Sequence, residues 1–380
     1  MSLIRDLTDE QARAALPQKW GAVGPGVIPA YVAEMDFAPA PVVRDVVVDA
    51  VRRGVTGYPT ENHLAVGAAF AGFAERHWGW APPAEAAVVT GDVIGGIRLV
   101  LDVLCPPGPV ALPLPCYPPF REILSITGRE LVPVLTDPDA DTATMDPAAL
   151  EAAFAGGART LLLCSPHNPL GRVWTRDELA TVRDLTSRYD VRVVADEIHG
   201  PLVLPGATFT PYLAVDPTAI LVTSASKAFN TPGLHCALLL TLDPAEQERL
   251  RSVPLPMNNG YSPLGMLAAV AAYTDGDPWL ADLVARLDEQ RTLLGKLLAE
   301  HLPLARMRPV EATYLPWLDL RAYGTDDLAE PALAHGLKLA AGQNYQPGLP
   351  GHVRLNTATS AERLTTMVER LAAAVAPRTP

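Results

Sequence analysis

The chain has few cysteines, and none of them lie close together. Only four of its 380 residues are cysteines, at positions 105, 116, 164 and 236, and no two form a Cys-x-x-Cys pair. Zinc and thiol redox sites use closely spaced cysteines, so the sequence predicts no metal site. We expect reduced thiols that are mostly buried. This pattern is typical of a protein that works in the reducing cytoplasm.

Long apolar runs and an excess of positive charge are also lacking. No run approaches the roughly 20 apolar residues that cross a bilayer, and the first residues have no signal-peptide core. A net charge of −12 argues against a nucleic-acid partner, which would need a basic face. Walker A, G-x-G-x-x-G and H-E-x-x-H motifs are missing as well. The sequence therefore predicts neither a membrane nor a nucleic-acid protein.

Short apolar segments alternate with helical ones through the middle of the chain. This alternation predicts an α/β fold with a mostly parallel, seven-stranded sheet. The expected helices are 41–53, 64–78, 95–104, 118–127, 147–155 and 177–188, and the expected strands are 87–90, 110–114, 131–135, 160–164, 191–195, 219–223 and 236–242.

The pattern changes after Asp243-Pro244. A helical stretch from 264 to 301, broken near 275–278, precedes short strands at 312–318 and 352–355 and a last helix at 360–375. Residues 1 to about 40 lack periodicity and are expected to form an arm. We therefore predict three parts: residues 1–45 as the arm and part of a small domain, 46–255 as the large domain, and 256–380 as the C-terminal small α+β domain.

Three of the apolar strands are followed at once by polar residues. Lys227 follows strand 219–223, Asp196 ends the strand at 191–195, and Asn168 comes just after strand 160–164. In open α/β sheets, ligands bind beyond the carboxyl ends of the strands. A lysine at such a place can lose solvation, which lowers its pKa and suits it to act as a nucleophile or base.

The order and spacing of these residues resemble a known family. The set Asn168…Asp196…Ser224-x-x-Lys227 is similar to fold-type I pyridoxal 5′-phosphate (PLP) enzymes of the class I/II aminotransferase superfamily. The segment Tyr31-Val32-Ala33-Glu34-Met35-Asp36-Phe37 resembles, more narrowly, the PatB/MalY-type cystathionine β-lyases. The likeness runs from about Gly26 to Ala358. It implies a large PLP-binding domain, a smaller domain and a homodimer.

The resemblance assigns the cofactor ring its partners. Lys227 would be the Schiff-base lysine, and Asp196 would keep the pyridine nitrogen protonated. Asn168 would bind the ring oxygen, Tyr117 would stack on the ring, and His199 would stand where many relatives carry a tyrosine. A satisfied structural histidine is the alternative for His199.

The phosphate would lie at a helix N-terminus. Asp92, Val93 and Ile94 occupy the matching place, where the contacts must come mainly from backbone N–H groups and Asp92 is expected to cap the helix. Ser224 would add a hydroxyl. Tyr58 would reach the phosphate of the neighbouring subunit, or else anchor its own loop. His235 stands where many aminotransferases have an arginine, so its contact with the phosphate is left open.

The substrate side is implied by the same resemblance. Arg354 would grip the α-carboxylate, and the segments containing Tyr31 and Ala33 would lie near the substrate side chain, together with the acidic pair Glu34 and Asp36. The implied activity is α,β-elimination from S-substituted cysteines. Transamination is the runner-up, followed by a decarboxylating or oxidising PLP enzyme and a non-catalytic regulatory protein.

Overall fold

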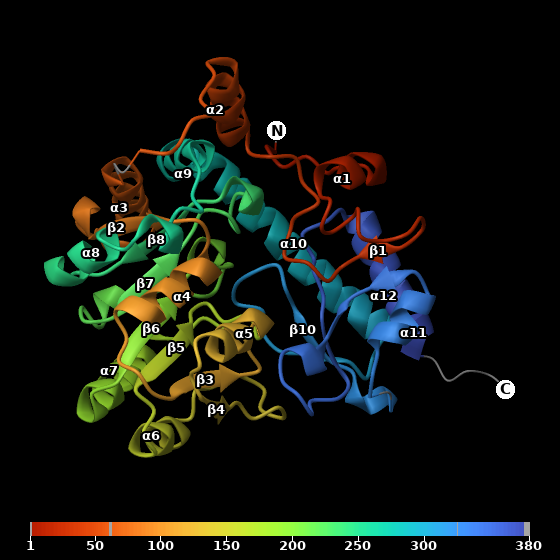
Figure 1. The fold of residues 1–380 in the computed structure, drawn as a ribbon. Coiled ribbons are helices and arrows are strands. Elements are labelled where there is room, and N and C mark those ends of the chain that lie inside the picture. Colours follow the sequence, from red (N-terminus) through yellow and green to blue (C-terminus); the bar gives the residue numbers. More distant parts are fainter. Residues whose placement is uncertain (1, 61–62, 325, 376–380) are drawn as a thin grey trace.

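The computed structural model describes residues 2–60, 63–324 and 326–375. Its centre is a seven-stranded sheet with the order β2-β8-β7-β6-β5-β3-β4, in which only β8 runs antiparallel to its neighbours (Figure 1). The strands are β2 Ala87–Thr90, β3 Val110–Leu114, β4 Leu131–Leu135, β5 Thr160–Cys164, β6 Arg192–Asp196, β7 Ile220–Thr223 and β8 Ala237–Leu240. The predicted α/β fold with a mostly parallel sheet is confirmed.

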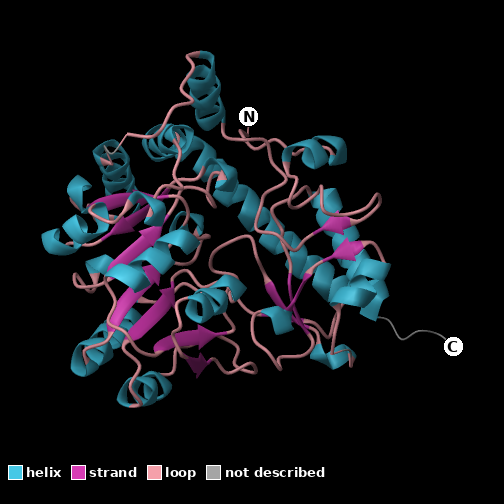
Figure 2. Cartoon of the chain, in the orientation of Figure 1, coloured by secondary structure: helices cyan, strands magenta, loops and turns pink. Residues whose placement is uncertain are grey.

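Helices cover both faces of this sheet (Figure 2). Alternate residues of a strand point to opposite faces. In β5, Leu161 and Leu163 pack into one cluster of buried side chains, whereas Leu162 packs into the other. One cluster includes α4 Val93–Val103, α5 Pro118–Ile126 and α8 Pro244–Arg251; the other includes α2 Pro41–Arg52, α3 Leu64–Trp78, α6 Pro147–Ala155, α7 Arg176–Tyr189 and α9 Pro263–Asp275.

A third, smaller cluster of buried residues lies among the C-terminal elements. It packs α10 Asp277–His301, α11 Ala329–Ala334 and α12 Ala361–Val375 against a sheet with the order β12-β13-β10-β9. These strands are β9 Arg306–Met307, β10 Trp317–Asp319, β12 Ala340–Ala341 and β13 His352–Arg354. In the arm, β1 Ile28–Pro29 pairs in parallel with β11 Leu337–Lys338. The predicted domain boundaries stay a prediction, and residues 376–380 lie outside the described part.

Two local expectations were wrong. The predicted strand at 312–318 is only Trp317–Asp319. Thr313 has φ of 73° and Pro316 lacks an N–H to donate, so the chain cannot extend as a ladder through them. The arm also contains a helix, α1 Asp9–Ala15, which Thr8 and Gln11 close with a capping box. Thr175 and Glu178 form a second capping box at the start of α7.

Over the described residues, no helix is both long and apolar enough to span a membrane. The same part of the chain contains no group of His, Cys, Asp and Glu side chains that could hold a metal ion.

Candidate active site

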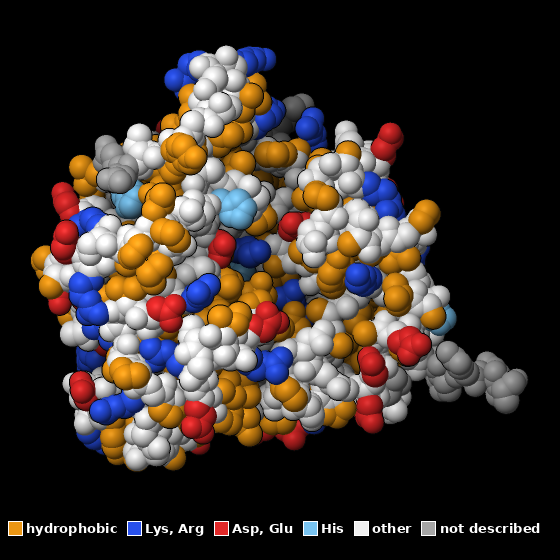
Figure 3. Space-filling view, viewed as in Figure 1, with side chains coloured by type: hydrophobic (Ala, Val, Ile, Leu, Met, Phe, Trp, Pro, Cys, Tyr) orange, Lys and Arg blue, Asp and Glu red, His pale blue; other side chains and the backbone are white. Residues whose placement is uncertain are grey.

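A cavity of about 190 Å³ opens at the carboxyl ends of β5, β6 and β7. The face shown in Figure 3 is hollowed between the large sheet and the α10–α12 part of the molecule. Most of the residues that the sequence singled out line this cavity. They are Ala33, Asp92, Val93, Ile94, Tyr117, Asn168, Asp196, His199, Ser224 and Lys227.

Lys227 follows β7 and presents its amine to the cavity. Its Nζ donates to the carbonyl oxygen of Ala33 at 3.0 Å. Burial and the nearby Arg354 charge lower the pKa of Lys227 to about 8, although Glu34 and Asp196 act in the opposite direction. About a tenth of this amine is therefore neutral at pH 7 and about half at pH 8, and the neutral form is the one that a nucleophile or base requires.

Asp196 ends β6 and is almost fully buried at the cavity wall. Its Oδ1 accepts from the Ile198 N–H at 3.0 Å. Burial raises the pKa of Asp196 to about 7, against the opposing effects of this bond and of Lys227. Asp196 makes no ion pair with any other described side chain. A buried carboxylate without a cation favours a cationic ligand group beside it.

Arg354 lies on β13 and reaches the cavity through Asn168. Its guanidinium donates to Asn168 Oδ1 at 3.1 Å and to the Tyr31 carbonyl at 2.6 Å, and it lies over the Tyr345 ring at 5.0 Å. Arg354 Nε is buried and has no partner among the described residues. Tyr31 therefore contributes its backbone here, because its hydroxyl donates to Gln18 instead.

Two ring-bearing residues face the same space. His199 is buried, and its Nδ1 has no partner in the described part of the chain. Burial, with the charges of Lys227 and Arg354, lowers the pKa of His199 to about 3, so this imidazole is neutral at physiological pH. Tyr117 stands at the N-terminus of α5 and lines the cavity.

The N-terminus of α4 forms another wall. Asp92 is its N-cap, and Asp92 Oδ1 accepts from the Gly95 N–H at 2.8 Å, as the sequence predicted. The first N–H groups of a helix have no intrahelical acceptor and favour an anion. Gly91 lies so close to Gly260 that an added Cβ would be 2.9 Å from its carbonyl carbon, which leaves room only for glycine.

The structure does not bring every predicted residue to the cavity. Tyr58 is 101% exposed, so it reaches no ligand site within its own chain. His235 is exposed, has φ of 53° and does not line the cavity. Ser224 lines it, but its hydroxyl already donates to the Cys236 carbonyl at 2.7 Å. Asp36, expected near the substrate, is instead buried against Lys19 and Arg363.

Some residues at the site were missed. Ser226 lines the cavity one residue before Lys227, and Tyr314 donates its hydroxyl to the Ala33 carbonyl at 3.0 Å. Asn230, three residues after Lys227, bonds both backbone groups of Met35 with its side chain. Ser226 could have been predicted from its position just after a strand. Tyr314 could not, because it lies in an irregular segment and no local sequence pattern predicts where its side chain points.

Comparison with known proteins agrees with this geometry. The family model for aminotransferase class I and II matches residues 31–371. The cystathionine beta-lyase of Corynebacterium glutamicum is 34% identical over 360 residues, covering 93% of this chain and 95% of that protein. The cystathionine beta-lyase PatB of Bacillus subtilis is 32% identical over 375 residues, covering 94% and 96%.

The solved structures include one of cystalysin from Treponema denticola, which contains a pyridoxal 5′-phosphate cofactor. It superposes with a TM-score of 0.90 at 25% identity, over 97% of this chain and 98% of that one.

Proposed function

Because the chain belongs to the aminotransferase class I and II family, we propose that it is a PLP-dependent carbon–sulfur β-lyase. It would convert S-substituted L-cysteines such as cystathionine into a thiol, pyruvate and ammonia. The observation that carries this proposal is the meeting of Lys227, Asp196 and Asn168 at one cavity, with Arg354 bonded to Asn168 at its edge.

The residues present fit the cofactor. Asp196 is a buried carboxylate without a cation, which suits a protonated pyridine nitrogen. His199 offers an unpartnered ring nitrogen, and the N-terminus of α4 offers free N–H groups for a phosphate. When bound, PLP supplies an electron-accepting ring that stabilises negative charge at the substrate α-carbon.

Arg354 and Lys227 divide the work on the substrate. The Arg354 guanidinium binds the α-carboxylate, and its buried Nε is a donor still without an acceptor among the described residues. Asn168 and Tyr345 hold the guanidinium in place. The neutral amine of Lys227 takes the α-proton, because its lowered pKa makes the free base available near pH 8. The sulfur then leaves Cβ as a thiolate and takes up a proton, and water hydrolyses the released three-carbon enamine to pyruvate and ammonia.

Incubation with L-cystathionine tests the proposal. We expect pyruvate and a free thiol to accumulate together in equal amounts. Pyridoxamine phosphate without thiol, reversed by adding a keto acid, would establish the aminotransferase instead. Borohydride treatment should fix the cofactor to Lys227, as shown by peptide mapping, in either case. Absence of that adduct would remove the PLP assignment altogether.

A homodimer with shared sites is part of the proposal. Support comes from Tyr58, fully exposed, and from exposed apolar side chains nearby in sequence: Val48, Val51 and Leu64. Helix α2, which carries two of them, projects from the body (Figure 1). Sedimentation should show a dimer, and Tyr58→Phe should weaken PLP retention. We also propose a cytoplasmic location, in keeping with four free cysteines.

The proposed substrates carry neutral or amine-bearing groups on sulfur. Glu34, but not Asp36, remains for the substrate side, since Asp36 is occupied by Lys19 and Arg363. Arg354 lies at the edge of the cavity for the α-carboxylate, and no arginine among the described residues lines the cavity itself to pair with a second carboxylate. A distal carboxylate would lose its hydration without gaining a partner. We expect kcat/KM for cystathionine and S-alkyl-cysteines to exceed that for aspartate. Aspartate as the best substrate would contradict the lyase assignment.

A further inference from the structure

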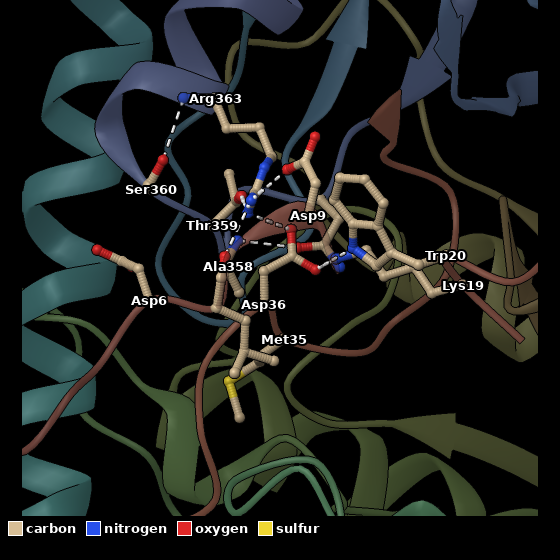
Figure 4. A network of polar contacts seen from close by, with 12 residues as sticks. Asp6, Asp9, Lys19, Trp20, Met35, Asp36, Ala358, Thr359, Ser360 and Arg363 are labelled. Carbon is tan, nitrogen blue, oxygen red and sulfur yellow. Dashed lines mark hydrogen bonds and ion pairs between the residues drawn. The ribbon is translucent and has the colours of Figure 1, made fainter. Parts of the chain in front are cut away.

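A second buried cluster of charges lies outside the cavity, where the N-terminal arm meets α12 (Figure 4). Lys19 and Asp36 are each 1% exposed, and their Nζ and Oδ1 atoms lie 2.8 Å apart. Trp20 Nε1 donates to the same oxygen at 2.7 Å, and Arg363 donates to the other carboxylate oxygen at 3.3 Å. We call Lys19, Trp20, Asp36 and Arg363 the arm network.

Burial makes the arm network a weak source of net stability. The loss of hydration of a buried ion pair offsets most of its attraction. Burial lowers the pKa of Lys19 even though the Asp36 carboxylate opposes that shift. The best attested use of such a pair is to fix one arrangement of the chain. Here the Lys19–Asp36 pair fixes the position of segment 33–36, which ends at Asp36.

This segment is bonded from several distant parts of the chain. Lys19 Nζ donates to the Glu34 carbonyl at 2.9 Å, and Asn356 Nδ2 donates to the same oxygen at 2.7 Å. The Asn230 side chain accepts from the Met35 N–H and donates to the Met35 carbonyl, each at 2.9 Å. The arm, the loop after Lys227 and the loop after β13 therefore meet on this one segment.

The other end of the segment touches the lysine of the cavity. The Ala33 carbonyl accepts from Lys227 Nζ at 3.0 Å and from the Tyr314 hydroxyl at 3.0 Å. The next residue, Glu34, has a buried carboxylate oxygen without a partner among the described residues. Burial raises the pKa of Glu34, whereas the charges of Lys227 and Lys19 lower it. Lys19 is thus linked to Lys227 in two ways. Both amines donate to neighbouring carbonyls of the same segment, and both charges act on the Glu34 carboxyl.

We propose that Lys19, acting through the arm network, positions the Ala33 carbonyl against Lys227 and so sets where that amine rests and how firmly it holds its proton. Lys19 does not line the cavity, so it is a positioning residue. The inference rests on the proposed function for the catalytic role of Lys227, but its central measurement needs no cofactor.

Removing Lys19 should shift Lys227 in one direction. A loosened Ala33 carbonyl would support the ammonium form less well, and Glu34, without the Lys19 charge, would be ionised less readily. Both effects favour the neutral amine. The titratable and charged groups that face Lys227 come from separate elements: Glu34 in the arm, Asp196 at the end of β6, His199 after it, Tyr314 before β10 and Arg354 on β13.

Lys19→Met in the full-length protein is the test. Competitive acetylation of the cofactor-free chain, read by mass spectrometry of the Lys227 peptide across pH, gives the midpoint of this amine. We expect the midpoint to fall by about one pH unit. In the holoenzyme, kcat for cystathionine should fall about tenfold with little change in KM, because a misplaced base slows proton transfer more than it weakens binding.

Two further variants separate positioning from stability. Arg192→Met breaks the partly buried pair of Arg192 with Glu246, at the opposite end of β6 from Asp196, and should lower the unfolding temperature without moving the Lys227 midpoint. Lys19→Met/Asp36→Asn removes both charges of the pair. It should regain part of the stability lost by Lys19→Met, yet keep the shifted midpoint because the bond to Glu34 is still missing.

The outcomes distinguish this inference from the proposed function. A Lys227 midpoint and kcat unchanged in Lys19→Met, with only the unfolding temperature lowered, would overturn it. Should that variant fail to fold, an unchanged midpoint in the double variant would do the same. An unaltered protein that forms no borohydride-stable adduct would refute the PLP assignment, whereas the acetylation midpoints would still decide the role of Lys19.

Discussion

The cavity and the arm network are two buried sets of charges that the fold treats in opposite ways. In the arm network, every charge has a partner: Asp36 lies against Lys19 and Arg363, and Arg363 also reaches Asp9 at 2.7 Å. In the cavity, Asp196 makes no ion pair with a described residue, and the Lys227 amine donates to a neutral carbonyl. The charges are therefore fully paired in the arm network, where their role is structural.

Burial shifts pKa values in both sets, since it also lowers that of Lys19, but Asp196 and Lys227 have no ion-pair partner among the described residues. Asp196 and Lys227 are moved toward neutrality, to about 7 and about 8, and burial is the largest cause for both. Lys227, which must take up a proton near neutral pH, needs such a value. A paired charge cannot exchange its proton without breaking the pair. The unpaired set is therefore the reactive one, at a cost in folding stability.

Lys227→Ala should give the largest effect. We expect kcat to fall by about 10³-fold or more, because both the covalent attachment and the proton transfer need the amine. Pyruvate release measures the rate, and borohydride trapping measures the attachment. Lys296→Ala on the exposed face of α10 is the matched control and should leave both unchanged. Full activity of Lys227→Ala would contradict the division between reactive and structural charges.

Asp36→Ala should damage the folded state most. It leaves Lys19 buried without its carboxylate, and breaking a buried pair from one side costs about 3–5 kcal/mol. Urea unfolding of the cofactor-free protein measures the loss. Asp49→Ala, which breaks the exposed pair with Arg53 on α2, should change stability by less than about 1 kcal/mol. Equal losses in the two variants would show that burial does not separate these pairs.

Asp196→Asn should stabilise the cofactor-free protein at pH 8. The folded-state pKa of Asp196, about 7, lies above the unfolded value, so the folded state binds the extra proton between pH 4 and 7. Stability is therefore lost as pH rises through this window. We expect a gain of up to about 4 kcal/mol for the asparagine variant at pH 8 and almost none at pH 4. If the gain in stability over the unaltered protein is no larger at pH 8 than at pH 4, this prediction is wrong.

Capture of PLP by the cofactor-free protein should show the smallest effect. The neutral amine of Lys227 attacks the aldehyde, and its fraction rises with pH through the pKa of about 8. The rate should rise about fivefold between pH 7 and pH 8 and then level off. Stopped-flow absorbance follows the reaction. His199 should contribute no step in this range, because its pKa is about 3. A rate that is flat over this interval would place the Lys227 pKa elsewhere.

The sequence predicted the large sheet and most of the cavity. Apolar runs bounded by polar residues reveal strands such as β5, and the polar residues after β5, β6 and β7 meet because parallel strands end at one edge. Asp196 and Lys227 could be assigned for that reason.

The arm network could not be predicted in this way. Asp36 looks like a substrate residue in the sequence, and its partners Lys19 and Arg363 lie on either side of it, one of them far along the chain. No periodicity links the arm to α12. Tyr58 and His235 are also exposed and lie outside the cavity of their own chain. The sequence could not show this, because the burial of a side chain depends on the assembled fold.

The contact of Asp36 with Arg363 spans 327 positions, so the two residues are translated at well separated times. The arm is made before the large sheet and α12 after it, and the large sheet can form between these two events. Until Arg363 has been translated, the Asp36 carboxylate has Lys19 and Trp20 as partners, but its second oxygen lacks the guanidinium. The arm network next to the reactive lysine should therefore be completed only after α12 has been made.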